Sequence, residues 1–98
     1  MEKKEFGKKM KYMREALGVS KYRIERRNGV LQRQSLLLES GESNMTLDKL
    51  FDYMNAIGLK MEIYAEIPAG ESFDRLPGET DREQAIRYWI HRQEKEID

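Results

Sequence analysis

Apolar residues in the first half of the chain recur every three or four positions, which is the spacing of one face of an α-helix. The pattern predicts four helices, over residues 4–17, 21–28, 32–40 and 47–57. A glycine follows each of them, at positions 18, 29, 41 and 58. Because glycine adopts a positive φ without a Cβ clash, it commonly ends a helix. The four glycines therefore support these bounds.

The first and fourth of these helices have the clearest apolar faces, which we expect to lie in the core. The face of the first helix comprises Phe6, Met10, Met13 and Leu17. The face of the fourth helix comprises Leu47, Leu50, Phe51, Met54 and Ile57. Ser20 and Thr46 precede the second and fourth helices, where a hydroxyl oxygen can accept a backbone N–H.

The period changes from helical to alternating at residues 59–67, which predicts a half-buried β-strand. Its apolar face comprises Leu59, Met61, Ile63, Ala65 and Ile67. No second strand is predicted in the chain, and a lone strand leaves its backbone groups unpaired. We therefore expect Met61, Ile63, Ala65 and Ile67 to dimerise the protein, through an antiparallel ribbon made with the same strand of a second copy.

Prolines and glycines interrupt residues 68–79, which we interpret as a linker. Thr80 and Glu83 then have the spacing of a capping box, and a final helix is predicted from Asp81 to Glu96. Its narrow apolar face includes Trp89 and ends at Ile97. Two roles stay open for this helix: it folds back on the core of the dimer, or it docks on a partner protein through Tyr88, Trp89 and Ile90.

The predicted fold is mainly α, with a domain over residues 1–58, a dimerising strand over 59–67, a linker over 68–79 and an amphipathic C-terminal helix in 80–98. The sequence contains no cysteine, which excludes disulfides and cysteine-based metal or nucleophile chemistry. A single histidine, His91, gives little support to catalysis, so we expect no catalytic residues, no metal and no cofactor. No apolar run approaches the roughly 20 residues of a membrane span, and the basic N-terminus does not resemble a secretory signal. We expect a cytoplasmic protein that does not bind membranes.

The net charge of zero conceals a strong asymmetry along the chain. Residues 1–41 contain 11 Lys or Arg and 5 Asp or Glu, a net charge of +6. Residues 42–98 contain 7 Lys or Arg and 13 Asp or Glu, a net charge of −6. A basic half of this kind favours contact with a polyanion such as double-stranded DNA.

The second and third predicted helices are short and are joined at Gly29, as in a helix-turn-helix. The third begins with Gln32, Arg33 and Gln34, whose side chains can hydrogen-bond to base edges in the major groove. Three leucines follow at 36–38, and they cannot all face one core. We expect Leu37 to be the exposed one, where it could contact a thymine methyl group.

Residues 6–57 resemble the lambda-repressor-like helix-turn-helix proteins, also called the XRE family. The resemblance is carried by an ordered set of residues, namely Ser20, Ile24, Gly29, Val30, Leu38, Glu39, Gly41, Thr46, Leu47 and Leu50. With the predicted strand included, the chain resembles antitoxins of the HipB type. The resemblance implies a four-helix DNA-binding domain, DNA binding as a homodimer, repression of the protein's own operon and a kinase-like toxin as a further partner.

The resemblance also assigns roles to individual residues. Base contacts fall on Gln32, Arg33 and Leu37, and a phosphate contact falls on Lys21. Contacts from the end of the third helix and the following loop fall on Ser40, Ser43 and Asn44. A structural ion pair joins Arg14 to Glu39, and removal of one partner from such a buried pair costs about 3–5 kcal/mol.

Three residues depart from the family pattern. Glu25 stands where a small residue is usual and would crowd the contact between the second and third helices. Ser35 stands at a usually apolar position, and Leu31 replaces the usual capping serine. A change of register by one residue would exchange Leu37 for Leu36 at the exposed position. Beside the DNA-binding interpretation we keep that of a protein-interaction module whose C-terminal helix docks on a partner through Tyr88, Trp89 and Ile90.

Overall fold

The computed structural model describes residues 1–96, and within that range the chain forms five α-helices and no β-strand. The helices are α1 (Lys3–Ala16), α2 (Lys21–Asn28), α3 (Gln32–Ser40), α4 (Leu47–Ile57) and α5 (Asp81–Glu96). The predicted mainly helical fold is confirmed. Ile97, which we placed on the apolar face of the last helix, lies outside the described residues. The chain divides into two compact units, Met1–Met61 and Glu62–Asp98.

The helix ends of the first unit follow from local chemistry. The Ser20 hydroxyl accepts the Arg23 N–H at 3.1 Å and starts α2, and the Thr46 hydroxyl accepts the Lys49 N–H at 3.3 Å and starts α4. Gly29 ends α2 with φ 74°, a left-handed conformation that glycine adopts at little cost. The helices α2, α3, α4 and α5 begin and end at the predicted residues, and α1 begins and ends one residue earlier than predicted.

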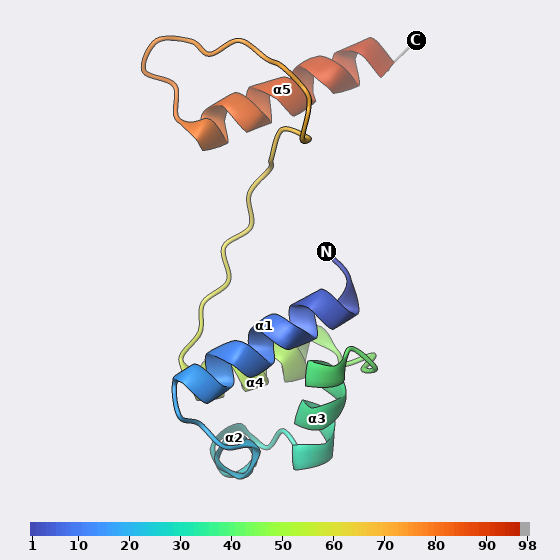
Figure 1. Ribbon diagram of the computed structural model, residues 1–98, viewed down its shortest axis with the longest axis vertical. Coiled ribbons are helices and arrows are strands. Elements are labelled where there is room, and N and C mark those ends of the chain that lie inside the picture. The colour runs from blue at the N-terminus through green and yellow to red at the C-terminus, as the bar shows by residue number, and fades with distance from the viewer. Residues whose placement is uncertain (97–98) are drawn as a thin grey trace. The chain divides into compact units, whose positions relative to one another are not determined.

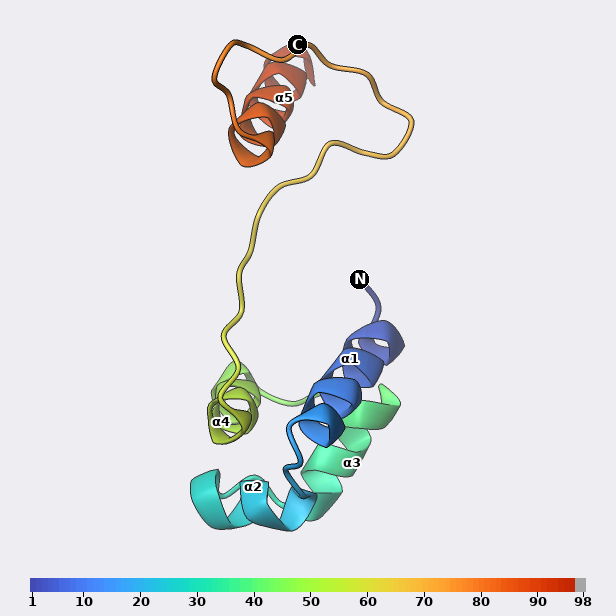
Figure 2. The same ribbon diagram turned by 60° about the vertical axis from the view of Figure 1, so that its left-hand side comes forward.

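In the first unit α1 packs against α3, and α2 packs against both α3 and α4 (Figure 1, Figure 2). The helices enclose a small apolar core made of Met10, Val19, Ile24, Val30, Leu38, Tyr53, Met54, Ala56 and Ile57. The eight-residue α2 is also tied to the C-terminal part of α4. Arg27 Nη1 donates to the Ala56 carbonyl at 2.8 Å, and Asn28 Nδ2 donates to the Asp52 carbonyl at 2.7 Å.

Gly7 sets the distance between α1 and α3. A Cβ atom built at this position would lie 2.4 Å from the Leu38 carbonyl oxygen and 2.6 Å from that of Glu39. Both atoms belong to backbone and cannot rotate away. The close approach of α1 to the end of α3 therefore requires glycine at position 7.

A buried polar network links α1, α3 and α4. The Arg14 guanidinium donates to both oxygens of the Glu39 carboxylate, at 2.8 and 2.9 Å, and to the Val19 carbonyl at 3.0 Å. The Tyr53 hydroxyl donates to the same carboxylate at 2.8 Å. Burial of the Tyr53 hydroxyl, together with this hydrogen bond, raises the pKa of Tyr53. The hydrogen bond to Glu39 raises the pKa of Arg14.

The buried face of α4 differs from the one that hydropathy predicts. Leu47 and Phe51, which we expected in the core, are 67% and 47% exposed, whereas Tyr53 is fully buried. The network explains the difference, because the Glu39 carboxylate is buried and requires hydrogen-bond donors. Tyr53 supplies one of them, and α4 is rotated accordingly.

Residues 59–67 do not form the strand that their alternation predicts. The segment has no regular secondary structure, and Ile63 is 90% exposed. A strand needs a partner for its backbone N–H and C=O groups, and no other strand is present in residues 1–96. The physical requirement that led us to expect a second copy is therefore unmet within the single chain.

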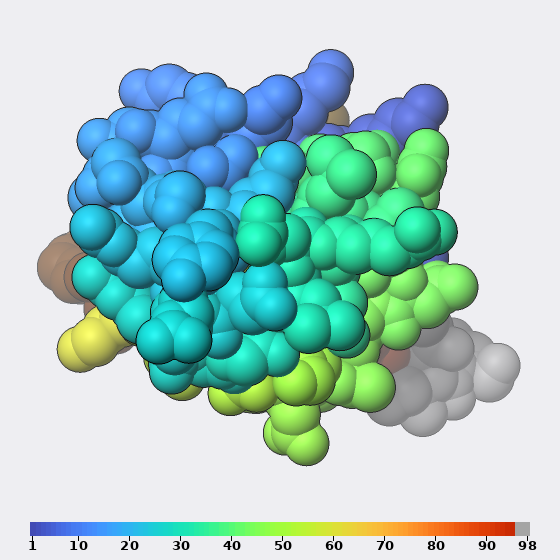
Figure 3. Space-filling view, turned by 90° about the horizontal axis from the view of Figure 1, so that it is seen from below, coloured from blue at the N-terminus to red at the C-terminus, as the bar shows by residue number. Residues whose placement is uncertain are grey.

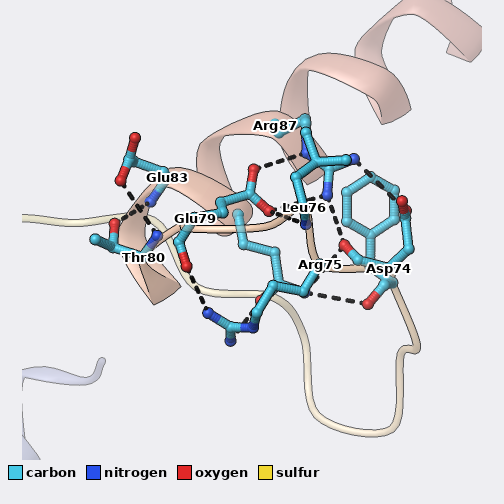
Figure 4. Close-up of polar contacts among 9 residues, drawn as sticks. Asp74, Arg75, Leu76, Glu79, Thr80, Glu83 and Arg87 are labelled. Atoms are coloured by element: carbon cyan, nitrogen blue, oxygen red, sulfur yellow. Dashed lines mark hydrogen bonds and ion pairs between the residues drawn. The ribbon is translucent and has the colours of Figure 1, made fainter.

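The second unit consists of α5 and the segment before it. Gln84 Nε2 donates to the Phe73 carbonyl at 3.1 Å, and the Phe73 ring meets the Tyr88 ring edge-on at 5.4 Å between centroids. Arg87 donates to both oxygens of the Glu79 carboxylate, at 2.8 and 3.0 Å (Figure 4). Residues 68–79, which we interpreted as a linker, thus contain no helix or strand and contact α5 through Phe73 and Glu79.

Candidate nucleic-acid interface

The surface formed by α2 and the N-terminal half of α3 contains four of the eight residues to which the sequence assigned DNA contacts. Figure 3 looks onto this surface, with the cyan α2 beside the blue-green α3. The turn between the helices is fixed from inside by Val30, which is fully buried. The backbone before α3 is thereby anchored, and the side chains that follow it are directed outward.

Gln32 and Arg33 lie at the exposed start of α3. Arg33 forms no hydrogen bond or ion pair with any residue in the described range 1–96. Its five N–H donors are therefore available to an external acceptor. A guanidinium with this freedom can bind the O6 and N7 acceptors of guanine in a bidentate manner.

Gln34 has a structural role that differs from the predicted base contact. Leu31 occupies the N-cap of α3 and has no side-chain oxygen to accept a backbone N–H. Gln34 Oε1 instead accepts the Leu31 N–H at 2.9 Å, which is the reciprocal half of a capping box. Its amide oxygen is thus occupied at the helix start.

The leucine run places Leu36 outside and Leu38 in the core. Leu36 is 53% exposed and Leu38 is 8% exposed, while Leu37 is half-buried. The more exposed leucine is therefore Leu36, one residue before the position that we selected. Ser35 is fully buried, and its hydroxyl is the one buried side-chain polar atom without a hydrogen-bond partner among the described residues.

Basic side chains also lie on α2, which packs against α3. Lys21, at the start of α2, is half-buried along its length. Arg23 and Arg26 are exposed on the same short helix, and our assignment of sites omitted both. The available signal was the composition of α2, in which four of eight residues are Lys or Arg.

The other polar residues assigned to DNA contacts each form a side-chain hydrogen bond within the first unit. The Ser40 hydroxyl donates to the Leu37 carbonyl at 3.0 Å, and the Ser43 hydroxyl accepts the Met45 N–H at 2.9 Å. Asn44 Oδ1 accepts from the Lys3 ammonium group. Both Ser40, the last residue of α3, and Asn44, in the loop that follows, are nevertheless exposed.

Glu25, which we expected to crowd the contact between α2 and α3, forms a hydrogen bond between the two helices. Its carboxylate reaches across to the first residue of α3, where Oε2 accepts a hydrogen bond from Gln32 Nε2 at 3.2 Å. Glu25 is half-buried and Gln32 is exposed. An acidic side chain therefore contacts the residue best placed to meet a base.

The residues assigned to dimerisation lie on both sides of the boundary between the units. Met61 is 43% exposed at the end of the first unit, and Ile63 is 90% exposed at the start of the second. Ala65 and Ile67 are half-buried within the second unit. Two of the four residues are therefore exposed and two are half-buried.

The side chains that we expected α5 to offer to a partner are mostly turned inward within the second unit. Tyr88 is 7% exposed, and Trp89 Nε1 donates to the Glu66 carbonyl at 2.7 Å. Ile90 is 52% exposed, and Ile86, one turn earlier, is 53% exposed. The exposed apolar part of α5 therefore comprises Ile86 and Ile90.

Neither a metal site nor a membrane span is found in the described part of the chain. Residues 1–96 contain no group of three or more metal-ligating side chains, and none of their helices has the length and apolarity needed to cross a bilayer. Comparison with known proteins adds no assignment: no protein-family model, curated protein or solved structure matches this sequence.

Proposed function

We propose that this protein is a sequence-specific DNA-binding transcriptional regulator of the lambda-repressor-like (XRE) helix-turn-helix type that acts in the cytoplasm. The observation that carries the proposal is the exposed start of α3. Gln32 and Arg33 project there beside a helix with four basic residues. Glutamine and arginine are the side chains best suited to read adenine and guanine in the major groove.

The unpartnered backbone around Ile63 supports the further proposal that the regulator acts as a homodimer. Two copies of residues 59–67 would pair as an antiparallel ribbon across a two-fold axis. The axis would place two copies of α3 in successive major grooves, about 34 Å apart. Lys21, Arg23 and Arg26 would then hold the phosphate backbone and set the register.

The test compares two single variants with the wild type on a selected DNA site and on random DNA. Arg33→Ala is expected to lose about 1–3 kcal/mol of binding free energy and to relax the preference at one base pair. Lys21→Ala is expected to weaken binding to all sequences similarly. It should also reduce the slope of log affinity against log salt concentration by about one. Equal affinity of the wild type for both DNAs, at about 0.15 M salt, would contradict the proposal.

A second proposal is that the protein is also a protein-interaction module, as an antitoxin would be, with a kinase-like toxin as its partner. The exposed pair Ile86 and Ile90 on α5 supports it, because the two side chains are one helical turn apart and uncovered. Ile86→Glu and Ile90→Glu would then abolish binding of a toxin encoded beside this gene. DNA binding would be unchanged in both variants, and retention of the toxin would reject the proposal.

A further inference from the structure

The hydrogen bond between Glu25 and Gln32 determines which end of the Gln32 amide faces the protein. The bond joins Gln32 Nε2 to Glu25 Oε2 at 3.2 Å. An ionised carboxylate only accepts hydrogen bonds, whereas an amide has an accepting oxygen and a donating nitrogen. The nitrogen must therefore face Glu25, whatever ambiguity attaches to amide oxygens and nitrogens elsewhere.

The amide oxygen of Gln32 is consequently the group left free, together with the second N–H. The edge of adenine in the major groove offers a donor at N6 and an acceptor at N7. This edge matches the free oxygen and the remaining N–H. Guanine offers two acceptors, O6 and N7, and an outward amide oxygen would be repelled by O6.

We infer that Glu25 is a positioning residue that sets the base preference of Gln32, by holding its amide in the orientation that accepts adenine and rejects guanine. The inference rests on the proposed DNA-binding function and adds a specificity determinant to it. Without the carboxylate, the amide can turn by 180° about its last torsion at little cost. Gln32 would then present N–H donors to guanine as readily as it presents its oxygen to adenine.

Glu25 should also lower the affinity for DNA of any sequence, and this effect can be measured separately from its effect on base preference. Its negative charge lies beside the phosphates that Lys21, Arg23 and Arg26 would contact, so it repels DNA of any sequence. Removal of this charge should strengthen binding to random DNA. A change in base preference accompanied by tighter general binding cannot be explained by loss of the fold.

The experiment measures binding of the full-length protein to a DNA site selected from a random pool and to the same site with each base exchanged in turn. Gln32→Ala first identifies the base pair that Gln32 reads, since the preference is lost there and kept elsewhere. Glu25→Gln is the informative variant, because it is isosteric and its amide can pair with Gln32 in either orientation. Glu25→Asp keeps the negative charge but is one methylene shorter.

The expected result is a fall of about fivefold or more in the adenine-to-guanine affinity ratio at that base pair in Glu25→Gln, which corresponds to the lower end of the discrimination by a bidentate contact. Glu25→Asp should lower the same ratio without tighter binding to random DNA. In a Gln32→Ala background Glu25→Gln should have no effect on base preference. The preference at the base pair read by Arg33 should stay unchanged in every Glu25 variant.

An unchanged adenine-to-guanine ratio in both Glu25 variants, with specific binding by the wild type, would overturn the inference and leave the proposed function standing. A loss of preference in Glu25→Gln that is equally large in the Gln32→Ala background would also overturn it, because Glu25 would then act without Gln32. A wild-type protein that selects no sequence would overturn both proposals.

Discussion

At the scale of single residues, the first unit depends on one buried carboxylate. Glu39 accepts hydrogen bonds from Arg14 and from Tyr53, which come from the helices on either side of it. A buried charge is tolerated only when it is paired and fully hydrogen-bonded. The resemblance suggested Arg14 as the partner of Glu39, but hydropathy ranks Tyr53 below Phe51 and could not reveal the third member.

The raised pKa of Tyr53 predicts a pH dependence of stability on the alkaline side. The folded state keeps the phenolic proton at pH values where an unfolded tyrosine, with a pKa near 10, has lost it. The contribution of Tyr53 is therefore complete below pH 10 and decreases as the pH rises above it. Urea unfolding between pH 8 and pH 11 should show a steeper loss in the wild type than in Tyr53→Phe. Parallel curves would contradict this assignment.

The unpaired hydroxyl of Ser35 predicts a stabilising substitution. A buried polar group without a partner costs about 1–3 kcal/mol, and alanine also has the higher helix propensity. Ser35→Ala should raise the free energy of unfolding by about 1 kcal/mol, as measured by urea denaturation. Ser40→Ala, on the same helix but exposed, is the matched control and should change stability by less than about 0.5 kcal/mol. A destabilised Ser35→Ala protein would show that the hydroxyl is satisfied.

At the scale of helices, the sequence predicted well where each helix begins and ends, because these positions depend on local chemistry. Ser20, Thr46 and the glycines that follow the helices act within a few residues of their own position. Which side of a helix is buried depends on other helices, and here prediction was weaker. Leu36 is more exposed than Leu37, the residue that we chose, and the hydrogen bond by which Gln34 caps α3 at Leu31 was not predicted.

Position 7 shows the same difference between local and tertiary effects. Helix propensity disfavours glycine there, whereas the packing of α1 against α3 requires it. Glycine inside a helix is less favourable than alanine by about 1 kcal/mol, so propensity alone predicts that Gly7→Ala stabilises the protein. The backbone carbonyls of Leu38 and Glu39 lie in the way of a Cβ atom. We expect Gly7→Ala to destabilise the first unit by about 1–3 kcal/mol. Lys8→Ala, at the exposed neighbouring position, is the control, and a more stable Gly7→Ala protein would refute the close contact.

At the scale of the whole molecule, the proposed dimer depends on the segment around Ile63. The alternation at 59–67 is a property of the sequence, but a strand forms only when a second strand is present. The sequence could therefore indicate the pattern without determining its pairing. In residues 68–79, the prolines and glycines predicted an interruption of regular secondary structure. They could not predict the contacts that Phe73 and Glu79 make with α5.

The proposed ribbon predicts that association is sensitive to Ile63. Ile63 is 90% exposed in the single chain, so its substitution should leave the fold of one copy intact. Ile63→Asp would place a charge on the apolar face of the ribbon and should shift the protein from dimer to monomer in sedimentation equilibrium. Ile63→Val keeps an apolar β-branched side chain and should remain dimeric. A wild-type protein that is folded and monomeric would exclude the ribbon.

The claim on which the account depends is that paired copies of α3 read DNA through Gln32 and Arg33. It is tested most directly by selection of bound fragments from a random pool of double-stranded DNA with the full-length protein. The account predicts a two-fold symmetric site with half-sites about one helical turn apart, and loss of one base preference per half-site in Arg33→Ala. Recovery of DNA without a common sequence, or an unchanged site with Arg33→Ala, would contradict it.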